Sequence, residues 1–448
     1  MSIPATPAPL GWGGILRLGL VQTALGAIVV LTTSTLNRVM VVELALPAML
    51  PGALVALHYV LQFLRPRWGH GSDVGGRRTP WIIGGMAVLG LGAVTASAAV
   101  AWMGSDTAAG VALAVAGFVL IGMGVGAAGT SLLALLATRV DPKRRAPAAT
   151  LVWMMMILGF AVTAGAVGAQ LDPYTPARLV AVTAVVSAVA LLVTLAAVWG
   201  TEGAPVRRPD IRKPPFAQAF RAVWSEGQTR RFAVFVFVSM LAYSLQDLIL
   251  EPFAGTVFGM TPGQSTSLAG VQHGGVFAGM VLVGLAGWLG RGRSVGSLKL
   301  WTVGGCLASA GALGLLVFGG MAGPGWPLKA TVAALGVSNG AFAVAAIGSM
   351  MALAGAGGPG REGMRMGVWG AAQAVAFGLG GFLGTAAVDA ARAVLAEPAV
   401  AYGLVFSAEA LLFVAAAALA ARPALGVRAM PKPAGGGGLA MLDAGGGR

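Results

Sequence analysis

Long apolar runs separated by short polar joins make up most of the chain. A hydrocarbon core about 30 Å thick needs roughly 20 apolar residues of helix to cross it. Twelve stretches meet that length, and Pro-Gly pairs mark several joins, as at Pro51-Gly52 and Pro262-Gly263. The pattern predicts an all-α membrane protein with transmembrane helices near 14–38, 50–68, 80–103, 108–138, 147–170, 177–199, 231–253, 265–290, 298–321, 327–354, 366–392 and 399–421.

Composition excludes a soluble globular protein. Hydrophobic residues make up 57% of the 448 residues and charged residues only 10%, against about 25% charged in soluble domains. Lipid tolerates such an apolar outer surface, whereas water does not. The net charge of +14 does not indicate a nucleic-acid partner, because the basic residues sit in short loops between apolar spans.

The distribution of lysine and arginine predicts the orientation. With the N-terminus inside, only four of the 29 basic residues, Arg38, Arg178, Lys329 and Arg392, fall in outside loops. Basic residues concentrate on the cytoplasmic side of bacterial membrane proteins. We therefore expect a multi-pass membrane protein with both termini in the cytoplasm.

The polar stretch 200–230 contains four prolines and six basic residues between the sixth and seventh spans. It predicts a cytoplasmic linker between an N-terminal six-helix half, 1–199, and a C-terminal six-helix half, 231–421. The tail 422–448 carries two glycine runs and is expected to be a disordered cytoplasmic segment.

Three short patterns recur in the two halves in the same order. Leu36-Asn37-Arg38 followed by Glu43 matches Leu245-Gln246-Asp247 followed by Glu251. The Pro-Gly pairs and the stretches starting at Trp81 and Trp301 also correspond. The common order predicts a duplication, and therefore two pseudo-symmetric halves of the kind that transporters use.

The loop between the second and third spans carries a motif. Gly69 to Arg78 resembles the G-x-x-x-D-x-x-G-R-R signature of the major facilitator superfamily. Gly69 and Gly76 permit a tight connection between two helices. Asp73 is suited to accept hydrogen bonds from a helix N-terminus and to pair with Arg77 or Arg78. The resemblance implies the twelve-helix fold of that superfamily.

Three stretches, Leu36–Leu44, Gln246–Phe253 and Gly69–Asp73, resemble the bacteriochlorophyll delivery (PucC-like) branch of the superfamily. The likeness extends from residue 14 to about 421, and the short signature loop is similar to the type named a bacteriochlorophyll synthase chain. The resemblance implies an assembly factor of the intracytoplasmic membrane. Such a factor would bind bacteriochlorophyll or a late precursor and deliver it to light-harvesting polypeptides, or act with bacteriochlorophyll synthase.

Three other functions remain to be weighed. A small-molecule transporter of the same fold would use an acid deep in the membrane for proton coupling, and only Glu409 lies well inside a span. A prenyltransferase would need clustered aspartates for magnesium and diphosphate, but the aspartates are scattered, so we expect no enzyme and no metal site. A pigment-free scaffold for antenna polypeptides is the third alternative.

Four polar residues in or beside the apolar spans are candidates for pigment binding. His58 and His273 lie in the corresponding helices 2 and 8, and a neutral imidazole can ligate the magnesium of a chlorin. Asn37 and Gln246 can hydrogen-bond to the keto and ester groups of a chlorin. For all four, packing between helices is the alternative role.

Four charged residues are candidates for a structural or gating role. Arg38 and Asp247 correspond in the two halves, and charges at that depth are costly unless they are paired or hydrated. We expect the two to face each other and hold the outer side shut. Glu43 and Glu251 also correspond and are expected to stabilise neighbouring backbone or a partner's cationic group, or to be solvated loop acids.

Overall fold

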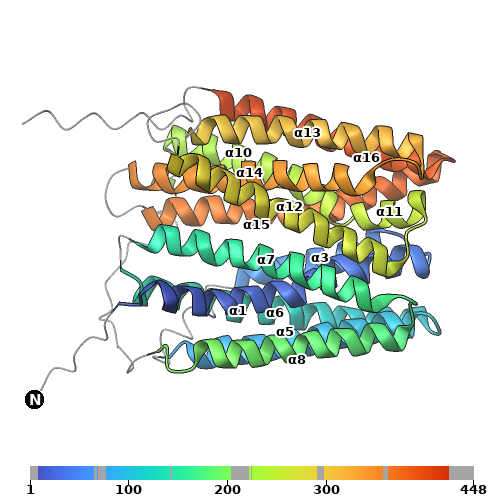
Figure 1. Ribbon diagram of the computed structural model, residues 1–448, viewed down its shortest axis with the longest axis horizontal. Coiled ribbons are helices and arrows are strands. Elements are labelled where there is room, and N and C mark those ends of the chain that lie inside the picture. Colours follow the sequence, from blue (N-terminus) through green and yellow to red (C-terminus); the bar gives the residue numbers. More distant parts are fainter. Residues whose placement is uncertain are drawn as a thin grey trace, which may run out of the picture.

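The computed structural model describes residues 9–64, 68, 77–141, 144–202, 221–222, 224–289, 297–356 and 362–422. Among these residues, twelve helical spans run side by side, with the joins gathered at the two ends of the molecule (Figure 1). The first half consists of α1 (Trp12–Val30) continued by η1 (Leu31–Thr35), α2 (Leu36–Arg38) and η2 (Val39–Glu43), then α3 (Met49–Val60) with η3 (Leu61–Leu64), α5 (Thr79–Met103), α6 (Thr107–Arg139), α7 (Arg145–Leu171) and α8 (Pro176–Val198). The second half consists of α10 (Gly227–Asp247) with α11 (Leu250–Phe258), α12 (Pro262–Leu289), α13 (Leu298–Ala322), α14 (Leu328–Ala356), α15 (Glu362–Val394) and α16 (Pro398–Ala421).

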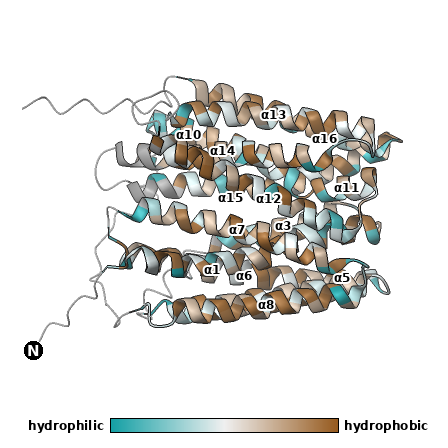
Figure 2. Ribbon diagram, in the orientation of Figure 1, coloured by the Kyte–Doolittle hydropathy of each residue, from teal (hydrophilic) through white to brown (hydrophobic). Residues whose placement is uncertain are grey.

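Eleven of these spans are long and apolar enough to cross a membrane, and α3 is a shorter apolar helix. Apolar residues cover the length of the helices, and polar residues gather toward their ends (Figure 2). Large apolar side chains such as Leu192, Phe318 and Leu411 point outward and are exposed. Lipid is the medium in which such a surface is stable.

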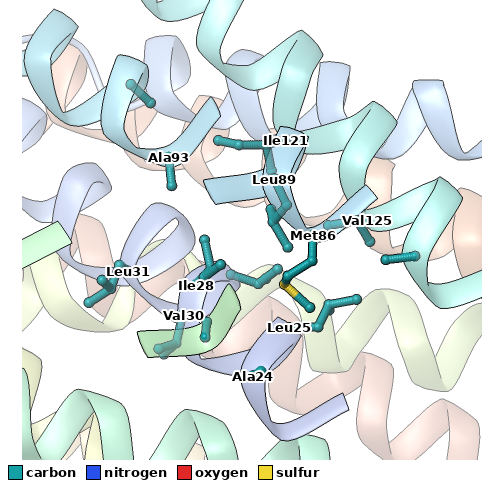
Figure 3. Close-up of a cluster of buried hydrophobic side chains, with 14 of the residues drawn as sticks. Ala24, Leu25, Ile28, Val30, Leu31, Met86, Leu89, Ala93, Ile121 and Val125 are labelled. Atoms are coloured by element: carbon teal, nitrogen blue, oxygen red, sulfur yellow. The ribbon is translucent and has the colours of Figure 1, made fainter. Parts of the chain in front are cut away.

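Each half has its own apolar core. The core of the first half joins α1, α5 and α6, where Leu25, Met86, Leu89 and Ile121 point toward one another (Figure 3). A second core draws on α10 to α16. Glycine lets the backbones approach: a Cβ at Gly124 would lie 2.4 Å from the backbone nitrogen of Leu89. Small residues allow such close helix packing in lipid.

The helix pairings of the two halves match. In the first half the contacts are α5 with α6, α1 with α7, α5 with α8, α1 with α8, and α3 with α6. The second half repeats them as α13 with α14, α10 with α15, α13 with α16, α10 with α16, and α12 with α14. The two halves are therefore pseudo-symmetric, as the recurring sequence patterns predicted.

Two long contacts join the halves, and they are counterparts under this symmetry. Helix α7 packs on α12, and α3 packs on α15. We call these the α7–α12 seam and the α3–α15 seam. Any site shared by the two halves lies along these seams or between them.

Some predicted boundaries need correction. The first span continues as helix beyond residue 38 to Glu43, through two π-helical turns. The seventh span is two helices, because α10 ends at Asp247 and α11 begins at Leu250. Most of the predicted linker 200–230, nearly all of the tail 422–448, and the signature residues Gly69, Asp73 and Gly76 lie outside the described residues.

Candidate functional site at the junction of the two halves

The first and seventh spans meet at one end of the bundle, which we call the Arg38 end. The joins 44–48, 172–175 and 259–261 lie there. Two π-helical turns bracket the three residues of α2, which carries Asn37 and Arg38. Both side chains are buried, and Arg38 is only 2% exposed. Local π-helical turns often occur at functional sites.

Asn37 ties the first span to the break in the seventh. Proline lacks the N–H that would bond the carbonyl four residues earlier, so Pro252 leaves the carbonyl of Leu248 without its intrahelical donor. The side-chain nitrogen of Asn37 donates to that carbonyl at 2.7 Å. The predicted interhelical role of Asn37 is therefore observed, and its Oδ1 keeps no hydrogen-bond partner in the described residues.

Arg38 bridges the two halves through a different partner from the expected one. Its guanidinium forms an ion pair with Glu43 on its own span and donates to the carbonyl of Met260 at 2.6 Å. Gly255 makes room, because a Cβ there would lie 3.1 Å from Nη2 of Arg38. The predicted pairing with Asp247 is wrong. The π-helical turn places Glu43, five residues on, beside Arg38.

The three acids that the sequence singled out near the break differ in their surroundings. Asp247 ends α10, is partly buried, and lies within electrostatic range of Tyr243 and Glu409. Glu251 is 4% exposed and within range of Arg38. The alternative of a solvated loop acid is therefore wrong for Glu251. Glu43 acts as the counter-ion of Arg38, with 34% of its side chain exposed.

A cavity of about 620 Å³ opens beside this ion pair. It is lined by Arg38, Glu43, Asp172, Pro173, Tyr174, Gly255, Gly259, Met260, Thr261 and Pro262. Burial raises the pKa of the Tyr174 phenol, the carboxylate of Glu43 raises it further, and Arg38 opposes both. The phenol therefore stays protonated and is a hydrogen-bond donor at this wall.

Gln246 is the least satisfied polar group near the break. It is 0% exposed, and neither its Oε1 nor its Nε2 has a hydrogen-bond partner in the described part of the chain. A buried amide without partners is costly. A bound ligand that forms hydrogen bonds with the amide would explain why Gln246 is buried without protein partners.

The two candidate histidines lie on α12 and α3, the corresponding helices of the two seams. His273 of α12 lies against Phe160 of α7, with ring centroids 4.9 Å apart in an edge-on contact. His58 of α3 is buried, with its ring centroid 4.5 Å from that of Tyr59. Tyr59 in turn stacks on Phe377 of α15 at 5.8 Å. The ring facing across the α3–α15 seam is thus that of Tyr59, which takes the place that His273 has in the other seam.

Asp172 and Asp389 have a role that the sequence analysis missed. Asp172 accepts hydrogen bonds from Thr261 Oγ1 at 2.6 Å and from the Gly263 nitrogen at 3.2 Å, at the start of α12. Asp389 accepts from the nitrogens of Ala48 at 3.0 Å and Met49 at 2.7 Å, at the start of α3. The available signal was that both acids lie near the ends of corresponding spans, the fifth and the eleventh.

The described part of the signature loop shows another unpredicted acid. Arg77 is exposed, and the backbone nitrogens of Arg78 and Thr79 donate to Glu202 at 2.5 and 2.8 Å. Glu202 follows the sixth span, so it caps the N-terminus of α5 from within the same half. An anionic cap at this position is favoured by the helix dipole.

Comparison with known proteins identifies the family of this chain. The family model described as PUCC protein matches residues 35–425. The chain belongs to the PucC family. A relative named Bacteriochlorophyll synthase 44.5 kDa chain, from Rhodobacter capsulatus, is 56% identical over 414 residues, which are 92% of this chain and 95% of the relative. Protein PucC of Rhodobacter capsulatus is 29% identical over 439 residues, 91% of each chain. The predicted resemblance is confirmed.

Solved structures confirm the fold of this PucC-family chain. A bacterial homologue of the human lysosomal transporter Spinster, in an inward-facing conformation, superposes with a TM-score of 0.64 at 16% identity, covering 91% of this chain and 95% of the other. The nucleoside transporter NupG superposes with a TM-score of 0.67 at 14% identity, covering 91% and 100%. At these identities the likeness shows the fold alone, which is that of the major facilitator superfamily.

Proposed function

We propose that this chain binds bacteriochlorophyll or a late precursor and hands it to light-harvesting polypeptides, or receives it from bacteriochlorophyll synthase. The names of its relatives support a role in the handling of photosynthetic pigment. The chain itself performs no covalent step in this proposal. Its partners are the pigment, membrane lipids and the proteins on either side of the transfer.

The imidazole of His273 carries the proposal for the site. It contacts Phe160 in the α7–α12 seam, and Phe160 packs against the apolar cluster of Ile157, Val276 and Met280. Its Nδ1 is buried without a hydrogen-bond partner in the described residues. A neutral imidazole in such surroundings is available as a ligand to the magnesium of a chlorin, so the residues present fit a pigment.

Gln246 supplies a second feature that fits the same ligand class. Its buried amide can donate one hydrogen bond and accept another. Chlorins carry keto and ester oxygens, which are acceptors for such a donor. An apolar ring with a few polar edges therefore matches a mostly apolar, lipid-embedded junction in which the Gln246 amide and the His273 Nδ1 have no hydrogen-bond partner among the described residues.

The sidedness is part of the proposal. The basic residues place the Arg38 end outside and both termini in the cytoplasm. Within phototrophic bacteria the membrane would be the inner membrane and its intracytoplasmic folds. The end opposite Arg38 then faces the compartment in which pigment is made.

The test is the absorption spectrum of the gently purified chain from a bacteriochlorophyll-producing host. We expect a near-stoichiometric chlorin band. His273→Tyr should remove most of it while leaving the thermal unfolding midpoint close to wild type, because the other seam already holds a tyrosine ring at this place. His70→Phe, at a histidine that the sequence places in a loop, is the matched control and should keep the band.

A chain that carries no chlorin in any preparation would contradict pigment binding and favour the pigment-free scaffold. Loss of pigment in both His273→Tyr and His70→Phe would show that the seam histidine has no special part.

A small-molecule transporter is the second candidate, because the solved structures with this fold include transporters. Solute-dependent proton flux in proteoliposomes would favour it. The absence of such flux in preparations that retain pigment would favour delivery.

A further inference from the structure

Two carboxylates cross from one half of the molecule to the other at the Arg38 end. Asp172 belongs to the first half and bonds Thr261 and Gly263 of the second. Asp389 belongs to the second half and bonds Ala48 and Met49 of the first. Each carboxylate uses both of its oxygens. Each therefore caps the first turn of a helix that its own half does not contain.

The two caps are counterparts under the pseudo-symmetry. Asp172 follows α7 directly and Asp389 lies in the last turns of α15, while the capped helices α12 and α3 are also counterparts. The environment of Asp172 is closely fitted, because a Cβ at Gly263 would lie 2.5 Å from its Oδ2. A glycine at 263 is therefore required for this approach of the carboxylate.

Other polar contacts between the halves lie at the same end. Thr35 meets Thr266 at 3.2 Å, Asn37 meets the Leu248 carbonyl, and Arg38 meets the Met260 carbonyl. At the opposite end, the contacts of Arg17 with Ala196 and of Glu226 with Arg365 each join residues of one half. The structure is thus a state closed at the Arg38 end.

We propose that Asp172 and Asp389 form a paired latch that holds the two halves together at the Arg38 end, and that the chain opens there when both caps release. A carboxylate at a helix N-terminus gains from the helix dipole and from the free N–H groups. Because donor and acceptor belong to different halves, separation of the halves must break both caps at once. This device goes beyond pigment handling and does not depend on which molecule the chain carries.

The test measures the exposure of the closed interface. A reporter cysteine at Thr266, which is fully buried, is introduced into a chain whose single cysteine is removed by Cys306→Ala. The purified protein in lipid nanodiscs is then labelled with a soluble maleimide, so that the result is independent of orientation. The rate of labelling reports the fraction of open molecules.

Removal of each cap should raise that fraction. A capping residue shifts an equilibrium by a factor of about five, so Asp172→Ala and Asp389→Ala should each speed labelling about fivefold. The two sites are far apart in sequence and sit on different seams, so the double variant should reach about 25-fold. Asp172→Asn with Asp389→Asn, which keeps an acceptor but removes the charge, should give an intermediate rate.

Asp106 provides a matched control. It caps α6 through the Ala109 nitrogen at 3.0 Å, and both residues belong to the first half. It lies on the same side of the membrane as the latch, in the join between the third and fourth spans. Asp106→Ala should therefore leave the labelling rate unchanged. A double latch variant that labels no faster than Asp106→Ala would overturn the proposal.

A second measurement guards against variants that are merely misfolded. Spin labels are placed at Ser105 and Ala396, which are exposed in joins of opposite halves at this end. The distance between them, measured by pulsed electron paramagnetic resonance, reports the separation of the halves. The double variant should add a population at longer distance while remaining monodisperse. A broadened distribution that also appears in Asp106→Ala would count against the latch, because it would reflect general loosening.

Discussion

The two seams between the halves are counterparts, yet they are packed differently. In the α7–α12 seam, backbones touch: a Cβ at Gly168 would lie 2.2 Å from Ser267 Oγ and also 2.6 Å from the Gly263 carbonyl oxygen, and one at Gly270 would lie 2.9 Å from the Gly165 nitrogen. At Gly52 and Gly378, in the α3–α15 seam, the nearest neighbours of such a Cβ are all side-chain atoms. At Gly52 the neighbour is Thr385 Oγ1.

The difference indicates how the halves are able to move. Backbone-to-backbone packing has no rotamers with which to adapt, whereas a seam filled by side chains can repack. The α7–α12 seam is therefore the more rigid of the two, and the α3–α15 seam is the one more able to repack when the halves move. The same contrast places His273 in a rigid setting, which is what a ligand to a bound group requires.

The largest effect is expected from Glu43→Ala, on the α12 side of the junction. It leaves the guanidinium of Arg38 buried with its counter-ion removed, and breaking a buried pair costs 3–5 kcal/mol. Because Glu43 is partly exposed, we expect about 3 kcal/mol. The measurement is the free energy of unfolding in mixed micelles, read from the denaturant midpoint.

The control is the double variant Arg38→Met with Glu43→Met, which removes both charges. It should be more stable than Glu43→Ala, since no uncompensated charge remains. Equal losses in the two proteins would show that the ion pair is not what stabilises this side, and would weaken the contrast between the seams.

The observed ion pair of Arg38 with Glu43 also shows how much of this site can be predicted from the sequence. Twelve apolar runs, recurring patterns and the basic loops are enough to predict the number of helices and their pairing into halves. The π-helical turns in the first span determine which acid lies beside Arg38, and no sequence pattern predicted them. The expected pair with Asp247 was therefore wrong. The latch residues were missed because an aspartate near the end of a span is common. Its role as a cap becomes visible only when the fold shows which helix of the other half begins beside it.

Asn37 is a case between these two. Pro252 signals from the sequence alone that the carbonyl of Leu248 needs an outside donor. Only the fold selects Asn37 among the amides of the chain, because the donor comes from a span 211 residues away. The sequence therefore predicts that the Leu248 carbonyl requires a hydrogen-bond donor from elsewhere, and the packing of the helices determines that Asn37 is this donor.

The second prediction compares the seams directly. Gly168→Ala places a methyl group against the backbone of α12, where overpacking costs about 2 kcal/mol. Gly52→Ala meets only the side chain of Thr385 and should cost less. Thermal unfolding of the detergent-purified chains gives the comparison. The control is Gly165→Ala, on the same helix, because no atom lies within 4 Å of a Cβ at this position. Its unfolding temperature should equal that of the wild type.

If Gly52→Ala lowers the unfolding temperature as much as Gly168→Ala, the two seams are equally tight and the proposed difference in rigidity between them is wrong. If adding Thr385→Ser, which removes the γ-methyl group of the neighbouring side chain, raises the unfolding temperature of Gly52→Ala, the result would instead support a seam that adapts through its side chains.

A third change tests a contact between the halves that belongs to neither seam. Asn37→Ala leaves the Leu248 carbonyl without its donor and should cost about 1.5 kcal/mol. Pro252→Ala restores an N–H to the helix, so in that background the cost of Asn37→Ala should fall by half or more. A double-mutant cycle on unfolding free energies measures the coupling. Additive losses would mean that the proline does not create the need that Asn37 meets.

The smallest expected effect concerns the ring pair that crosses each seam. Phe160 meets His273 in one, and Phe377 meets Tyr59 in the other. Aromatic pairs contribute roughly 1 kcal/mol beyond burial, so Phe160→Leu and Phe377→Leu should each lower unfolding free energy by about that amount. The seams should differ in a second readout: Phe160→Leu frees the ring of His273 to rotate and should lower retained pigment, while Phe377→Leu should not. Equal pigment loss from both would place the pigment between the halves without preference for either seam, and the rigid surroundings of His273 would then have no part in holding it.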